Sequence, residues 1–173
     1  LDIKASEKAA RFIRTCDAFN TPVVTFVDSP GFIPSVEVEK TGLVRRATKL
    51  AYAYAEASVG KITVITRKAF GPAYVFMGSK DLGADLAYGW PTAEIAVAQT
   101  SQAAESIYGA EATEEQKAAL EDKFMGPYQA AERGMVDAVI SPDATRGHLI
   151  EGLRLLERKV VPAALKKHGN ITL

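Results

Sequence analysis

The chain has 173 residues, of which 47% are apolar, so it is long enough for about one domain with one hydrophobic core. Its 21 Lys and Arg residues balance 21 Asp and Glu residues, which argues against a strongly basic surface that would bind nucleic acid. The nearly apolar stretches, such as residues 22–27, have the length of a strand and fall short of the ~20 residues that cross a bilayer. We therefore expect a soluble domain whose partners include neither nucleic acid nor a membrane.

The start of the chain and its few cysteine and histidine residues exclude further classes. The sequence begins Leu1-Asp2-Ile3, with neither an initiator Met nor a signal peptide, which predicts a piece of a longer protein. The single cysteine, Cys16, cannot form an internal disulfide, which fits a reducing cytoplasm. Neither His148 nor His168 has a partner at a metal-ligand spacing, so we expect no metal site. An enzyme with so few titratable groups would depend on backbone donors and a bound cofactor.

The predicted elements alternate between helix and strand. A helix is expected over residues 6–19, with Ser6 as its N-cap and with Phe12, Cys16 and Phe19 on one face. A buried central strand is expected over 23–27, followed by a helix that carries Leu43, Ala47, Leu50, Tyr54 and Ala57 on one face. A strand over 61–67 precedes a helix that begins at Pro72, and a strand over 95–97 precedes a helix over about 100–108. The last predicted elements are a helix from a capping box at Thr113 to about Phe124, a short helix to Gly134, a strand over 137–140, and a helix with Leu149, Leu153, Leu156 and Val160 on one face.

This alternation predicts an α/β fold with largely parallel strands. The predicted strands begin at uneven intervals, which argues against a repeat protein. Four strands are few for a closed sheet, so we expect the first strands of the domain to lie upstream of Leu1.

Two glycine-containing loops follow predicted strands, at residues 28–32 and 70–74. Ligands of parallel sheets bind beyond the carboxyl ends of the strands, where the first N–H groups of a helix can hold an oxyanion. Both loops could therefore line one cleft, although the spacing alone favours the simpler interpretation that Gly and Pro only make turns. The cationic stripe of Arg45, Arg46 and Lys49 is most simply a solvated helix face, and the acidic residues Asp81, Asp85 and Glu94 have no diagnostic spacing.

Seven segments, spread in order over the whole chain, resemble one family. They resemble the carboxyltransferase β subunits of biotin-dependent acyl-CoA carboxylases, most of all the branch with propionyl-CoA carboxylase and methylmalonyl-CoA carboxyltransferase. The segments are KAARF at 8–12, FVDSPGF at 26–32, VITRKAFG at 64–71, MGSK at 77–80, WPTAEIAV at 90–97, AERGMVD at 131–137 and KHGNI at 167–171.

The resemblance implies a fold, an activity and a set of partners. The fold would be crotonase-like (ClpP/crotonase), a spiral of β-β-α units, with residues 1–173 as a single C-terminal carboxyltransferase domain that lacks its first strands. The activity would be carboxyl transfer between carboxybiotin and a short-chain acyl-CoA of the propionyl or acetyl class. Biotin would arrive on a partner, the biotin carboxyl carrier or biotin carboxylase subunit, and would not be attached covalently here. The N-terminal carboxyltransferase domain of a neighbouring subunit would bind the acyl-CoA in a homo-oligomer of six subunits.

The resemblance also implies site residues. In the family pattern the second loop reads Gly-Gly-Ala-Tyr, and the second Gly and the Ala donate backbone N–H groups to the ureido carbonyl of biotin. The matching catalytic residues here are Gly71, Pro72 and Ala73; Ala73 can donate, whereas Pro72 has no backbone N–H. The implied biotin-binding residues are Pro30, Gly31, Phe32, Tyr74 and Gln99, and Val75 corresponds to the acyl pocket.

Gln99 is a second departure, because relatives have a turn of small residues there. Two other interpretations therefore stay open: a carboxyltransferase-like assembly subunit with impaired catalysis, and a crotonase-fold acyl-CoA decarboxylase.

Overall fold

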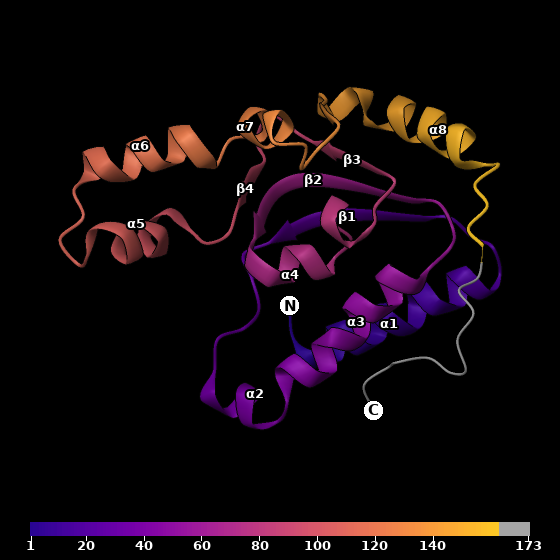
Figure 1. The fold of residues 1–173 in the computed structure, drawn as a ribbon, viewed down its shortest axis with the longest axis horizontal. Helices are drawn as coiled ribbons and strands as arrows, with labels where there is room; N and C mark the ends of the chain where they lie inside the picture. Colours follow the sequence, from indigo (N-terminus) through magenta and orange to yellow (C-terminus); the bar gives the residue numbers. More distant parts are fainter. Residues whose placement is uncertain (163–173) are drawn as a thin grey trace.

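The computed structural model describes residues 1–162 of the chain. Its centre is a sheet of five strands, all paired in parallel, in the order β1-β2-β3-β5, with β4 paired to the far end of β2 (Figure 1). The strands are β1 (Val23–Ser29), β2 (Lys61–Phe70), β3 (Leu86–Gly89), β4 (Glu94–Ala96) and β5 (Ala138–Val139). Because β2 contacts three other strands, it is the central strand of this sheet.

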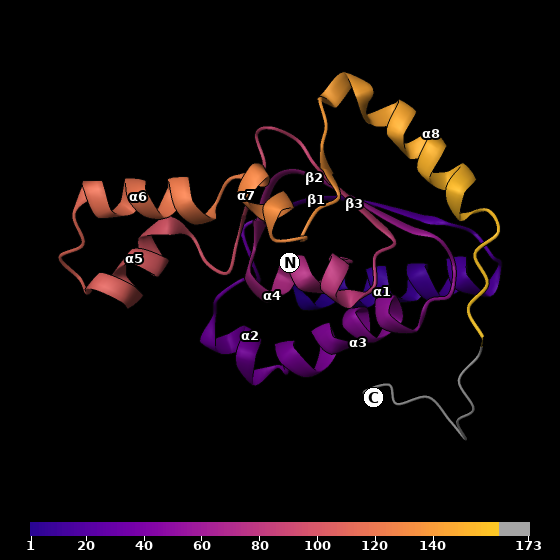
Figure 2. The ribbon, with the colours of Figure 1, turned by 45° about the horizontal axis from the view of Figure 1, so that its top comes forward.

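Helices cover both faces of the sheet, as Figures 1 and 2 show. The helices are α1 (Ile3–Ala18), α2 (Val36–Lys40), α3 (Leu43–Glu56), α4 (Gly71–Phe76), α5 (Thr100–Tyr108), α6 (Glu114–Phe124), α7 (Pro127–Glu132) and α8 (Thr145–Leu156), with 3-10 turns at Lys80–Leu82 and Pro142–Ala144. Helices α1 and α3 lie on one face, where Ile13 and Leu50 pack with Val23. Helix α8 lies on the other, where Leu149, Leu153 and Leu156 pack on Ile62 and Val64. Helices α5 and α6 form a hairpin that extends beyond the sheet.

Several predictions from the sequence are confirmed. The fold is α/β with a parallel sheet. Helix α3 buries Leu43, Ala47, Leu50 and Tyr54, the apolar stripe that its spacing predicts. Helix α5 has the predicted bounds, and α6 begins with the predicted capping box between Thr113 and Gln116.

The first helix differs from its prediction in its cap and in its buried face. Its N-cap is Asp2, whose carboxylate accepts a hydrogen bond from the Ala5 N–H at 2.6 Å, and Ser6 is fully buried within the helix. The buried face consists of Ser6, Ala10 and Ile13, whereas Phe12 is 63% exposed and Phe19 is 79% exposed. The prediction was wrong because it followed the large aromatic residues, while small side chains allow the close approach to α3.

The strands contain a second group of corrections. Strand β1 lies at the edge of the described sheet and not at its centre, and Phe26 is exposed there. Strand β3 was not predicted, and neither was the short helix α2. Helix α4 begins at Gly71, one residue before Pro72, and Val160 lies beyond the end of α8 and is exposed. The predictions for His168 and for residues 167–171 fall outside the described residues. None of the helices in the described part has the length and apolar character that crossing a bilayer requires.

Candidate functional site

The two candidate loops leave neighbouring strands and meet beyond the sheet. Ser29 at the end of β1 pairs with Ala69 near the end of β2, so the loop after β1 and the turn after β2 start side by side. The rings of Phe32 in the loop and Phe76 in α4 touch edge to face, with centroids 5.7 Å apart. The structure therefore brings the loops together at the carboxyl end of the sheet, the usual place for ligands of parallel sheets.

The loop after β1 depends on a glycine and on a contact with the start of the chain. Gly31 has a φ angle of +133°, which side chains rarely adopt, so another residue there would strain the backbone. The backbone N of Leu1 donates to the Gly31 carbonyl at 2.8 Å, and the Ile33 N–H donates to the Leu1 carbonyl at 3.1 Å. These two bonds hold the loop against the segment before α1, with Pro30 exposed.

The turn after β2 also needs a glycine. Gly71 has a φ angle of +62°, and a Cβ atom added there would lie 3.1 Å from the Val97 carbonyl oxygen. Gly71 thus lets the end of β2 approach the segment that follows β4. Pro72 is exposed, whereas Ala73 exposes none of its surface. Ala73 is the third residue of α4, so its N–H is among the first four that a helix leaves without an internal partner.

Tyr74 and Val75, expected at the site, face the core instead of open solvent. Tyr74 packs with Val27 and Ile65, and the half-buried Val75 lies against the same cluster. Burial, with a smaller contribution from the Asp81 carboxylate, raises the pKa of the Tyr74 hydroxyl to about 12. The phenol is therefore neutral at physiological pH, and in this chain it serves packing.

A pocket of about 370 Å³ lies between the end of β2, the start of β4 and the α5–α6 hairpin. It includes Gln99, which immediately precedes α5, and its other walls are Lys68, Phe70, Glu94, Thr100, Ser101, Glu114, Lys117, Ala118 and Glu121. Its volume lies in the range of small-molecule sites. The contribution of α6 was not foreseen, because the sequence gives no signal that this helix folds back against the end of β2.

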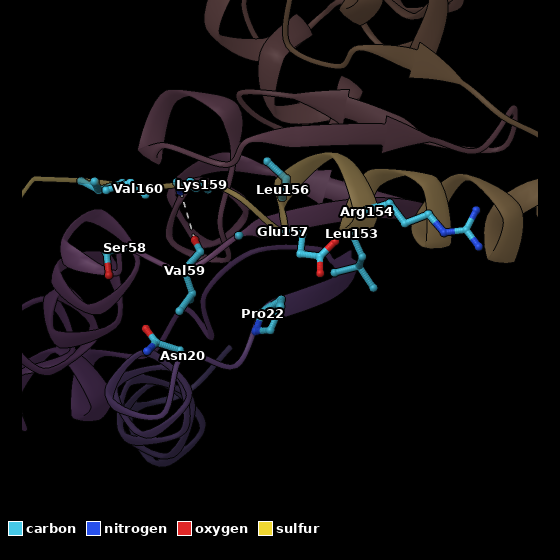
Figure 3. A pocket seen from close by; sticks show the side chains of 12 residues that line it. Asn20, Pro22, Ser58, Val59, Leu153, Arg154, Leu156, Glu157, Lys159 and Val160 are labelled. Carbon is cyan, nitrogen blue, oxygen red and sulfur yellow. Dashed lines mark hydrogen bonds between the residues drawn. The ribbon is translucent and has the colours of Figure 1, made fainter.

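A larger pocket of about 740 Å³ lies at the opposite end of the sheet (Figure 3). Pro22, Val59 and Gly60, which precede β1 and β2, form one side, and Leu156 and Lys159 form the other. The Lys159 ammonium donates to the Val59 carbonyl at 3.0 Å and to the Asp85 carboxylate at 2.9 Å. This pocket is at the amino ends of the strands, so we place the candidate site at the carboxyl end despite its smaller volume.

The turn provides fewer donors than the family pattern requires. Pro72 has no N–H, and Ala73 is covered by its surroundings. The residues present do not fit a two-donor site for the ureido carbonyl, although the adjacent pocket has room for a small ligand. Within residues 1–162, no group of three His, Cys, Asp or Glu side chains is placed to hold a metal ion.

Nearly the whole chain matches one family model. Residues 1–171 match the model of the carboxyl transferase domain. The chain belongs to the carboxyl transferase domain family.

Two curated relatives show the range of this family. The biotin-dependent acetyl-/propionyl-coenzyme A carboxylase beta5 subunit of Mycobacterium tuberculosis (strain ATCC 25618 / H37Rv) is 54% identical over 186 residues, covering 100% of this chain and 34% of the relative. The methylmalonyl-CoA decarboxylase subunit alpha of Veillonella parvula is 53% identical over 174 residues, with the same coverage. This carboxyltransferase domain thus spans about a third of the length of the curated relatives it matches.

A solved structure confirms the fold. The transcarboxylase 12S structure with methylmalonyl-coenzyme A and methylmalonic acid bound superposes with a TM-score of 0.97 at 46% identity, covering 100% of this chain and 34% of that one. The expected crotonase-like fold of a C-terminal carboxyltransferase domain is therefore confirmed. Transcarboxylase 12S itself forms a hexamer assembly.

Proposed function

We propose that this carboxyltransferase domain forms one wall of the active site of an enzyme that transfers a carboxyl group between biotin and an acyl-CoA. The superposition on transcarboxylase 12S over the full length of the chain carries this proposal. The name of the Mycobacterium tuberculosis relative supports an acyl-CoA of the propionyl or acetyl class. The lining of the 370 Å³ pocket, at the carboxyl end of the sheet, would be the part of this wall that a ligand contacts.

The partners of the proposed enzyme lie outside this chain. Biotin would reach the site on a biotin carboxyl carrier or biotin carboxylase subunit, and would supply the activated carboxyl group when it is bound. The acyl-CoA would be held by the N-terminal carboxyltransferase domain of a neighbouring subunit, in an assembly of six. We place this enzyme in the cytoplasm.

The residues of this chain would shape the wall and exclude water from it. Phe32 and Phe76 join the loop to α4, and Gly71 allows the two backbone segments to approach. We assign no proton or charge transfer to Pro72 or Ala73, because neither offers an open donor.

This lack of donors favours a second candidate function. A carboxyltransferase-like subunit that supports assembly, with impaired catalysis of its own, would tolerate Pro72. The decarboxylase subunit among the relatives supports a third candidate, an acyl-CoA decarboxylase.

A chimera separates these functions. This chain would replace the matched segment of the Mycobacterium tuberculosis beta5 subunit, and the chimera would be assayed with its biotinylated partner and propionyl-CoA after its mass in solution has been checked. We expect carboxyl transfer by the chimera. No transfer is expected from the 173-residue chain alone, assayed with free biotin and methylmalonyl-CoA. An assembled but inactive chimera would favour the assembly role, and release of CO2 without transfer would favour the decarboxylase.

A further inference from the structure

Strand β2 changes partners partway along its length. Residues 62–65 pair with β3, whereas residues 68–70 pair with β4. On its other side, Val27 of β1 pairs with Ile65 and Ser29 pairs with Ala69. Asp28 alone therefore faces three residues of β2, at 66–68. Such a bulge bends a strand and redirects the residues after it, and here it turns the end of β2 toward β4.

The carboxylate of Asp28 occupies this bulge. It accepts a hydrogen bond from the Lys68 backbone N–H at 3.2 Å. It also accepts three bonds from the Arg67 guanidinium, from Nε at 3.1 Å and 3.3 Å to its two oxygens and from Nη2 at 2.9 Å. One side chain of β1 thus binds two consecutive residues of the bulge, one through its backbone and one through its side chain.

The opposite side of the bulge is held by the segment between β3 and β4. The Trp90 N–H donates to the Ile65 carbonyl at 2.9 Å, and the Thr92 hydroxyl donates to the Thr66 carbonyl at 3.0 Å. Hydrogen bonds to Arg67 and Lys68 lower the pKa of the Asp28 carboxyl, so it stays ionised at neutral pH. Hydrogen bonds therefore hold the bulge of β2 on both sides.

The pair between Asp28 and Arg67 is open to solvent, with 39% and 64% of the two side chains exposed. Exposed ion pairs contribute little to global stability, typically about 0–1 kcal/mol. Gly71 follows Lys68 by three residues, and its position against the Val97 carbonyl leaves little room for displacement. The effect of the Asp28–Arg67 pair is therefore local, because it fixes the position of the Gly71 turn at the end of β2.

We propose that Asp28 is a positioning residue, which holds the bulge of β2 through Arg67 and the Lys68 N–H and thereby places Phe70 and the Gly71 turn at the candidate site. The structural part of this inference stands on the contacts alone, and its catalytic part rests on the proposed function. Asp28 acts through β2 and is assigned no contact with a reacting group.

Amide exchange measured residue by residue in the 173-residue chain tests the structural part. In Asp28→Ala we expect exchange at Ala69, Phe70 and Ala73 to become about tenfold faster, with the amides of 62–65 unchanged. Asp28→Asn keeps an acceptor for the Lys68 N–H and should give a smaller effect. The control is Glu151→Ala, which removes a more exposed ion pair, with Arg154 on α8. Exchange that rises only at Lys68, that rises equally at 62–65, or that rises alike in the control overturns the proposal.

Kinetics of the chimera test the catalytic part. In Asp28→Ala we expect kcat to fall about tenfold with an unchanged KM for acyl-CoA, and Asp28→Asn to recover part of this loss. A change in KM with an unchanged kcat would overturn the catalytic part. An unchanged kcat in a variant whose amide exchange is altered would overturn it as well. An inactive parent chimera would count against the proposed function, while the exchange result would still decide whether Asp28 holds the bulge.

Discussion

Pro72 has opposite consequences for the fold and for a ligand. It lies in the first turn of α4, where the N–H groups have no partner within the helix, so the helix loses no hydrogen bond. A ligand that accepts hydrogen bonds from this turn would lose one donor. The sequence alone was sufficient for this deduction. It did not reveal that Ala73, the remaining donor of the pattern, is buried.

Replacing Pro72 by Gly tests whether this donor limits catalysis. We expect Pro72→Gly to raise carboxyl transfer by the chimera by up to ~10²-fold, because one oxyanion donor is typically worth ~10²–10³ in rate. The free energy of unfolding should fall by only about 0.4–1 kcal/mol, through the greater freedom of the unfolded chain. Steady-state kinetics measure the rate of carboxyl transfer, and urea unfolding measures the free energy of unfolding. Pro142→Gly, at another exposed proline that begins a 3-10 turn, is the control. A fast parent chimera that Pro72→Gly does not improve would contradict the family-based donor placement.

Lys61 is a second residue whose environment has a measurable consequence. It is only 4% exposed, and its ammonium donates to the Tyr54 carbonyl at 2.7 Å. Burial lowers its pKa, and the nearby Lys159 lowers it further, while Asp85 and Asp17 oppose the shift. The folded state therefore holds this proton less tightly than the unfolded state does.

Stability should rise with pH wherever Lys61 loses its proton in the folded state but not in the unfolded state. Below the folded-state pKa the cost of the buried charge is fully present, and it disappears as pH rises toward the ordinary value of 10.5. We therefore expect the free energy of unfolding of the chain to rise relative to Lys61→Met as the pH approaches 10.5 from below. Urea unfolding at several pH values measures this difference, with Lys8→Met on the exposed face of α1 as the control. A difference that is constant or falls with pH would show that burial does not control this lysine.

At the scale of elements, long regular sequence patterns predicted their helices correctly, whereas short segments and segments of small residues were missed. The long apolar stripe of α3 and the capping box of α6 contain enough residues to specify a helix. Strand β3 was missed because its four residues, Leu86–Gly89, include Ala and Gly and lack β-branched side chains. The position of β1 in the sheet depends on its partners, which the sequence of β1 does not identify. The meeting of the two loops followed from the parallel strands, whereas the buried direction of Tyr74 and the contribution of α6 depend on tertiary packing.

The corrected face of α1 gives a test at this scale. Ile13→Ala should lower the free energy of unfolding of the chain by ~2–5 kcal/mol, because Ile13 is 2% exposed and its truncation would leave a cavity against α3. Phe12→Ala on the same helix should change it by less than about 0.5 kcal/mol, although it removes a larger side chain. Urea unfolding of both variants gives the comparison. Equal losses would restore the face first predicted from the aromatic spacing.

At the scale of the whole molecule, the α5–α6 hairpin is the part least supported by the rest of the described chain. Figures 1 and 2 show it extending beyond the sheet, away from α8. Leu120 of α6 is buried, but two other apolar side chains of the hairpin keep exposed surface, with Ile107 61% exposed and Phe124 39% exposed. Exposed apolar side chains on a projecting element fit a surface that a partner covers. This agrees with the proposal that a neighbouring subunit covers part of the domain.

The assembly of the chimera tests this role of the hairpin. We expect the parent chimera to form an oligomer in solution, and Ile107→Lys combined with Phe124→Lys to shift it toward smaller species, because two charges would have to be buried at the contact. Light scattering across a range of concentrations measures the mass, and circular dichroism checks that both proteins are folded. Ile150→Lys, at an exposed apolar residue on α8, is the matched control and should leave the mass unchanged. A monomeric parent, or an oligomer that the control disrupts and the hairpin variant does not, would place the interface elsewhere on the molecule.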